Sequence, residues 1–150
     1  MKVFIVVALM LSSISALDQV SNLKTQVGEA CDSTGYVTIL EFDVEPWIPV
    51  EATSSVITIQ ATINQPNMGV GTISFGTENK LQQWTYEYLP VNQRFNQGTE
   101  QTFQYVLYWP TLPGNYITQV TIGGIDIPVS INACWTFSFS LGTGMNITFD

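Results

Sequence analysis

The 150-residue sequence has no histidine, and it has only four lysine and arginine residues against twelve aspartates and glutamates. Histidine is the most frequent general base, the usual partner of a nucleophilic serine or cysteine, and a common zinc ligand. Its absence therefore argues against these chemistries. With a net charge of −8, the chain also lacks the basic stripe that would neutralise nucleic-acid phosphates, so we expect no nucleic-acid partner.

The remaining polar side chains form no recognisable catalytic pattern. Ser138 and Ser140 have no nucleophile-elbow sequence around them. Glu41, Asp43 and Glu45 alternate along one predicted strand, which spreads their carboxylates along the strand instead of wrapping them around an ion. We interpret these three as a polar side that faces water. The sequence thus predicts a protein that is not an enzyme and that uses no metal ion or cofactor.

The first residues have the layout of a secretory signal peptide. Lys2 precedes an apolar run at 3–11, and small residues follow up to Ala16, where we expect cleavage. The run is too short for a membrane-spanning helix, which needs about 20 residues; a retained anchor is the alternative. We expect 1–16 to be removed and 17–150 to form a single domain with a short C-terminal tail, in a secreted or endolysosomal location.

The chain has two cysteines, Cys31 and Cys134. An even number of cysteines in a secreted chain favours a disulfide, which here would bring the two ends of the domain side by side. Two separate buried thiols are the alternative. The tail contains the sequence Asn146-Ile147-Thr148, which makes Asn146 a candidate glycosylation site.

Apolar and polar residues alternate in short segments that are separated by turn residues, and no helical period extends over three turns. These features predict an immunoglobulin-like antiparallel β-sandwich of seven to nine strands. Residues 125–131 are interrupted by Pro128, which indicates an edge strand or two short pieces. The other predicted strands are 36–45, 55–64, 69–75, 81–88, 103–109, 116–122 and 134–141.

The strand at 103–109 carries four large apolar groups at a spacing of two residues. Pro110 ends this strand, Pro113-Gly114 favours a turn, and Tyr116 begins the next alternating segment. We therefore predict a hairpin-like pair with an unusually bulky aromatic face. We interpret 77–80 as a polar turn and 90–101 as a longer loop.

Several short motifs, taken in order, resemble a known family. Cys31 precedes the first strand, 42–46 reads Phe-Asp-Val-Glu-Pro, 57–61 reads Ile-Thr-Ile-Gln-Ala, 113–116 reads Pro-Gly-Asn-Tyr, and Cys134 leads an aromatic strand. From about residue 28 to 141 the chain is similar to the ML lipid-recognition domain family, which includes phosphatidylglycerol/phosphatidylinositol transfer proteins and Niemann-Pick lysosomal cholesterol carriers. The additional internal cysteine pairs of the family are missing here.

The resemblance implies two sheets splayed enough to hold a lipid tail or sterol between them. We expect the inward-facing side chains, including Trp84, to line the space between the sheets. Trp47, Ile48 and Phe95 are candidate contacts at the entrance to that space. A closed core in a structural or protein-interaction module, or in an accessory subunit of a complex, would use the same residues. The predicted lipid-binding residues are Phe42, Ile59, Ile73, Phe75, Tyr86, Phe103, Tyr105, Leu107, Tyr116, Val120, Phe137 and Phe139.

The expected partner is therefore one lipid or sterol. Delivery would involve a transient contact with a membrane or an acceptor protein, although the negative net charge disfavours direct docking on anionic lipids at neutral pH. We expect a monomer unless the chain belongs to a larger complex.

Overall fold

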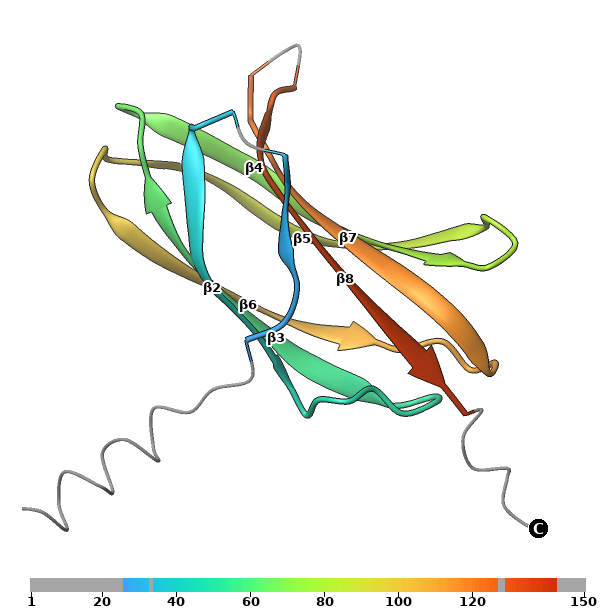
Figure 1. The fold of residues 1–150 in the computed structure, drawn as a ribbon. Helices are drawn as coiled ribbons and strands as arrows, with labels where there is room; N and C mark the ends of the chain where they lie inside the picture. The colour runs from blue at the N-terminus through green and yellow to red at the C-terminus, as the bar shows by residue number, and fades with distance from the viewer. Residues whose placement is uncertain (1–25, 33, 127–128, 143–150) are drawn as a thin grey trace, which may run out of the picture.

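The computed structural model describes residues 26–32, 34–126 and 129–142, which form a β-sandwich (Figure 1). Within these ranges there are eight strands: β1 Glu29–Asp32, β2 Val37–Glu45, β3 Ser54–Ile63, β4 Met68–Asn79, β5 Trp84–Phe95, β6 Glu100–Tyr108, β7 Gly114–Gly123 and β8 Ile131–Leu141. The predicted all-β class is confirmed. The proposed signal peptide and Asn146 lie outside the described residues and stay predictions.

The strands form two antiparallel sheets. The larger sheet has the order β1-β8-β7-β4-β5, and the smaller has the order β2-β3-β6. The alternation in the sequence determines which face of each sheet is buried. In β3, the side chains that point between the sheets are Ile57, Ile59, Ala61 and Ile63, and the residues between them point outward. The two sheets enclose one apolar core.

The predicted pairing of 103–109 with 116–122 is wrong. β6 belongs to the three-stranded sheet and β7 to the five-stranded sheet, so residues 109–113 cross from one layer to the other. The signals at Pro110 and Pro113-Gly114 do end one strand and begin the next. A proline-rich turn, however, does not determine whether the chain returns within its own sheet or crosses to the opposite one.

Strands β4 and β5 are longer than the sequence predicted. β4 continues to Asn79, and the turn lies at 80–83, where the Asn79 side-chain oxygen accepts hydrogen bonds from the backbone N–H groups of Leu81 and Gln83. β5 continues through Pro90 to Phe95, in the region predicted as a loop. Pro90 is tolerated because β5 is an edge strand. The tip of this hairpin projects away from the other strands (Figure 1).

The N-terminal part of the fold links the two sheets. Gln26 forms a bridge with Asp43 of β2, and the Val27 N–H donates to the Phe42 carbonyl, 3.1 Å away. A few residues later the chain forms β1, which pairs with β8. This segment covers Asp43, which is 9% exposed. The prediction that Asp43 faces water is therefore wrong, because residues 26–27 pair with β2 on the side predicted to be exposed.

The Cys31–Cys134 disulfide is present and joins β1 to β8, with the two Cα atoms 5.2 Å apart. Residues 125–126 and 129–130 belong to no strand, so the strand predicted there is reduced to Ile131, the first residue of β8. None of the described segments is a helix with the length and apolar character needed to cross a membrane.

Candidate functional site

Of the predicted lining residues, Tyr86 and Trp84 lie on the outer face, and the others lie between the two sheets. Phe42, Ile73 and Val120 are fully buried, and Phe103 is 8% exposed. Tyr105 is half-buried and packs against the core. Strand alternation therefore identified the inward face correctly in every strand except β5. Contact of these side chains with a lipid stays a prediction, because burial alone also describes an ordinary core.

The interior next to β8 is filled by a large group of aromatic rings. Phe137 lies 5.7 Å from Phe42 and 6.2 Å from Trp109, measured between ring centroids, and Phe139 lies 4.9 Å from Trp109 and 5.5 Å from Tyr116. These are edge-to-face, tilted or stacked contacts of the kind that stabilise aromatic cores. They make this half of the interior a continuous aromatic surface.

The polar groups of these aromatic side chains all have partners within the protein. The Trp135 indole N–H donates to the Val27 carbonyl at 2.7 Å, and the Trp109 indole N–H donates to the Ser55 hydroxyl at 2.8 Å. The Tyr116 hydroxyl donates to the Leu112 carbonyl at 2.7 Å. The polar atoms of these rings are therefore paired within the protein, and both indole hydrogen bonds are buried.

A second group of apolar side chains lies where β5 faces β6. Leu89, Val91 and Phe95 of β5 are half-buried, and the Phe95 ring meets Phe103 of β6 edge to face at 6.0 Å. β5 and β6 are the outer strands of different sheets, and no ladder of backbone hydrogen bonds joins them in the described part of the chain. We call the contact formed by Leu89, Val91, Phe95, Phe103 and Tyr105 the β5–β6 seam.

Glu87 connects the two strands at one end of the seam. Its carboxylate accepts hydrogen bonds from the Tyr105 hydroxyl at 2.9 Å and from the Tyr108 backbone N–H at 3.2 Å. The Tyr105 ring stacks on Phe75 of the opposite sheet at 4.7 Å. Burial of the phenol, followed by the hydrogen bond to Glu87, raises the pKa of Tyr105 to about 12. Tyr105 therefore stays protonated at physiological pH.

The predicted inward orientation of Tyr86 and Trp84 is wrong. Tyr86 is 52% exposed and Trp84 is 39% exposed, and both lie on the outer face of the five-stranded sheet. On the inner face of β5 the sequence places Thr85, Glu87 and Leu89 instead. The more hydrophobic side of β5 is thus its outer side. An edge strand gains little burial from its inner face, so its alternation does not identify the core.

Sequence reasoning missed two residues of the interior and its edge. Trp135 is buried and stacks on Phe42 at 5.6 Å. Its position two residues before Phe137 would have identified it from strand phase. Because Trp84 and Tyr86 were predicted to point inward, Glu87 between Tyr86 and Tyr88 was predicted to point outward. No signal in the sequence indicated its contact with Tyr105. Of the candidate mouth residues, Trp47 and Phe95 pack against the core, whereas Ile48 is exposed.

A hollow of about 310 Å³ lies at the end of the interior, where the β4–β5 hairpin meets the 109–113 connection. Tyr116, buried in the core, forms part of its wall. Hydroxyl and amide groups contributed by Thr77, Asn79, Gln83, Thr85 and Thr111 supply most of the remaining lining. A mostly polar hollow at the end of an apolar interior suits the polar group of an amphipathic ligand.

Comparison with known proteins gives similarity in structure and none in sequence. No protein-family model matches the chain. No curated protein sequence matches it either.

Several solved structures are similar to the fold, including those of three different proteins. The C-terminal domain of wzt has a TM-score of 0.64 at 8% identity, with 85% of this chain and 92% of that chain covered. A Niemann-Pick type C2 protein from Japanese carpenter ant has a TM-score of 0.52 at 10% identity, with 77% and 99% covered.

The third structure is the alkylpurine DNA glycosylase AlkC of Pseudomonas fluorescens, bound to DNA containing an abasic site analog. Its TM-score is 0.51 at 11% identity, and the match covers 72% of this chain but only 31% of that one. At these identities the three likenesses establish the β-sandwich fold, and a Niemann-Pick type C2 protein, a member of the family whose motifs the sequence resembles, is among the proteins that share it.

Proposed function

We propose that this protein binds one lipid or sterol, with the apolar part of the ligand between the two sheets and its polar group in the hollow at the β4–β5 hairpin. The observation that carries this proposal is the β5–β6 seam. It is an edge of the sandwich closed by apolar side chains and by Glu87, without strand pairing. The similarity to a Niemann-Pick type C2 protein supports the proposal at the level of the fold.

The two edges of the sandwich are held together differently, and this difference indicates where a ligand would enter. On the β1–β2 side, the chain itself crosses between the sheets, and backbone hydrogen bonds and the disulfide fix it there. On the β5–β6 side, separation of the strands breaks the Glu87 hydrogen bonds and the contacts of Phe95 with Phe103. The 96–99 connection joins the two strands beside Phe95, so we infer that the seam opens at its other end, where Glu87 contacts Tyr105 and Tyr108.

The driving force would be the transfer of hydrocarbon from water to an apolar interior, about 0.8 kcal/mol for each buried methylene group. Such a mechanism uses no nucleophile, base or metal ion, in keeping with the proposal that the protein is not an enzyme. The disulfide is compatible with a secreted or luminal location, where a lipid carrier of this kind would act.

The alternative function is an interaction module with a permanently closed core. It is favoured by the close ring contacts across the interior, such as the 4.7 Å between Phe75 and Tyr105, which occupy the space that a ligand would need. Lipid binding and a closed core give opposite results in a binding experiment, because a protein whose core stays closed cannot take up a lipid.

The test is equilibrium binding of the fluorescent sterol dehydroergosterol and of a pyrene-labelled phosphatidylcholine to the purified protein. Phe103→Asp places a charge in the seam and should weaken binding by at least about tenfold, a loss of about 1.4 kcal/mol or more. Val106→Asp is the matched control, since Val106 lies on the same strand but is 46% exposed. This control should bind like the wild type.

A second variant guards against misfolding of Phe103→Asp. Thr85 is exposed and lines the hollow, so Thr85→Trp should fill it while leaving the core intact. Thr102→Trp, at an exposed position on β6, is its control. Wild-type affinity in folded Phe103→Asp and in Thr85→Trp would place the ligand elsewhere, and no binding of either probe to the wild type would favour the closed-core module.

A further inference from the structure

The outer face of the five-stranded sheet carries an exposed row of aromatic side chains on β5. Trp84, Tyr86 and Tyr88 are 39%, 52% and 56% exposed. Their rings are nearly parallel, with interplanar angles of 13° and centroids 6.0 Å and 6.2 Å apart. Single exposed aromatic residues need no explanation, but an ordered group of three on one strand marks a surface that binds something. We call these three residues the aromatic platform.

The neighbouring strand is shaped to support the platform. Gly76 of β4 is directly opposite Tyr86, and a Cβ atom at this position would lie 2.7 Å from the Tyr86 ring and 3.1 Å from the Trp84 ring. The rings therefore lean over the glycine and pack against the sheet. Their orientation is fixed by this contact, which leaves their other surfaces free for a ligand.

The strand register shows which side chains share the face with the platform. Tyr88 is in line with Ser74 of β4 and Thr121 of β7, and Tyr86 is in line with Gly76, with Gln119 of β7, and with Thr136 of β8. Hydroxyl and amide groups thus continue each aromatic row across the sheet. They can both donate and accept hydrogen bonds.

Charged groups are few on this face. Along the same rows, the register adds Ile117 and three acidic residues, Glu78 opposite Trp84 and Glu29 and Asp32 at the far ends. Lys80 lines the hollow beyond Glu78. A nucleic acid would need a basic surface here, and the sheet offers none in these rows. A neutral ligand rich in hydroxyl groups matches both the lack of charge and the hydrogen-bonding groups.

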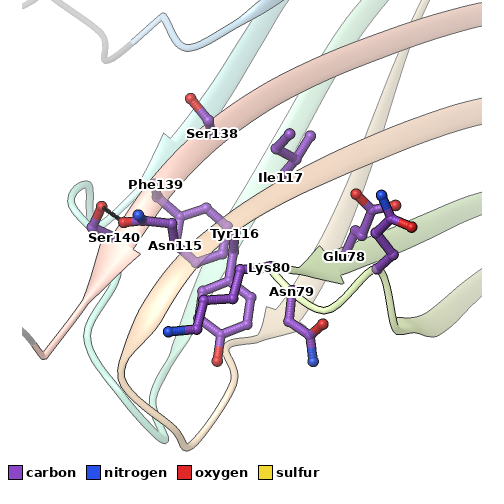
Figure 2. A pocket seen from close by; sticks show the side chains of 10 residues that line it. Glu78, Asn79, Lys80, Asn115, Tyr116, Ile117, Ser138, Phe139 and Ser140 are labelled. Atoms are coloured by element: carbon purple, nitrogen blue, oxygen red, sulfur yellow. Dashed lines mark hydrogen bonds between the residues drawn. The ribbon is translucent and has the colours of Figure 1, made fainter.

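The platform lies between two hollows. One, of about 490 Å³, is beside Tyr88 and includes the hydroxyls of Thr72, Ser74 and Thr121 in its lining. The other, of about 540 Å³, lies beyond Glu78 and is lined by residues that include Asn115 and Ser140 (Figure 2). Together with the rows between them, the hollows form an elongated surface along the strands. A chain of several similar units would use this length better than a single small molecule.

We propose that the outer face of the five-stranded sheet binds a neutral oligosaccharide or polysaccharide. The apolar faces of successive sugar rings would lie on the aromatic platform, and their hydroxyl groups would hydrogen-bond to Gln119, Thr136 and the side chains that line the two hollows. The platform and the hollow beside Tyr88 face away from the interior, whereas the hollow beyond Glu78 shares Asn79 and Tyr116 with the one proposed for the polar group of the lipid.

The experiment is isothermal titration calorimetry of the purified full chain with three neutral hexasaccharides: cellohexaose, mannohexaose and chitohexaose. We expect saturable binding of at least one of them. Tyr86→Ala should weaken that binding by at least about tenfold, with dehydroergosterol binding unchanged. Tyr108→Ala is the matched control, because Tyr108 is a 67% exposed tyrosine on the edge strand of the other sheet. It should bind within about twofold of the wild type.

Three results would overturn the proposal. One is the absence of binding to all three hexasaccharides at millimolar concentration. Another is an equal loss of binding in Tyr108→Ala. The third is a wild-type dimer in analytical ultracentrifugation that becomes a monomer in Tyr86→Ala, when no saccharide binds. The platform would then be an interface between two copies of the chain.

Discussion

At the scale of single residues, Glu87 and Tyr105 connect the two sheets at the edge where we place the opening. Both side chains lie at the end of the seam next to the hollow, and the carboxylate also accepts a hydrogen bond from the Tyr108 backbone. A hydrogen bond to a charged carboxylate contributes about 1.5–3 kcal/mol to stability. That is strong enough to keep the seam closed in water and weak enough to break when a ligand compensates for it.

Tyr105→Phe tests this contact through its pH dependence. The pKa of Tyr105 is about 12 in the folded protein, whereas an unfolded chain has a tyrosine pKa of about 10. Above pH 10 the unfolded chain releases a proton that the folded protein retains, so the stabilisation from Tyr105 is complete below pH 10 and is lost as the pH rises toward 12.

Urea unfolding of wild type and Tyr105→Phe at a series of pH values from 8 to 12 measures this effect. Below pH 10 the wild type should be more stable by about 1.5–3 kcal/mol. The difference in the free energy of unfolding should shrink toward pH 12. A difference that is constant across the series would show that Tyr105 has no raised pKa in the folded protein.

At the scale of the strands, sequence alternation identified the inward face wherever both faces of a strand have distinct surroundings. In β3, β6 and β8 the apolar positions are the buried ones, because one side of each strand meets the opposite sheet. The pattern misled only at β5. There the aromatic residues pack over Gly76 on the outer face, a contact between strands that the sequence of β5 alone does not contain.

Two further features of the strands could not be derived from local sequence. One is the crossing of 109–113 between sheets, which depends on strand order across the whole molecule. The other is β1, a four-residue strand whose pairing with β8 rests on residues about a hundred positions away. The disulfide was predictable from the compartment and the cysteine count, and it was the one long-range constraint that the sequence supplied.

Removal of this disulfide should weaken the attachment of β1 to β8. The Cys31→Ser/Cys134→Ser variant loses a cross-link across 103 residues, and loss of a native disulfide typically lowers the free energy of unfolding by about 2–5 kcal/mol. Urea unfolding of the variant and of the oxidised wild type gives the difference. The wild type in reducing agent is the control and should match the variant. A loss below about 1 kcal/mol would mean that β1 is held by its backbone pairing instead.

At the scale of the whole molecule, the two edges of the sandwich have different constructions. The N-terminal segment and the disulfide hold the β1–β2 side. On the β5–β6 side the chain crosses between the sheets only at 96–99, and beyond that connection the contacts are made by side chains and by Glu87. The aromatic platform lies on the outer face of β5, the same edge strand that forms the seam. The molecule thus has two distinct candidate surfaces for ligands, one internal and one external.

The most direct test of the internal site is native mass spectrometry of the protein secreted from a eukaryotic host, with organic extraction of whatever is bound. Our account predicts a lipid or sterol at a stoichiometry of about one per chain, lost in the folded Phe103→Asp variant and retained in Val106→Asp. A mass equal to that of the polypeptide alone, unchanged after incubation with sterols and phospholipids, would contradict it and identify the interior as a closed core.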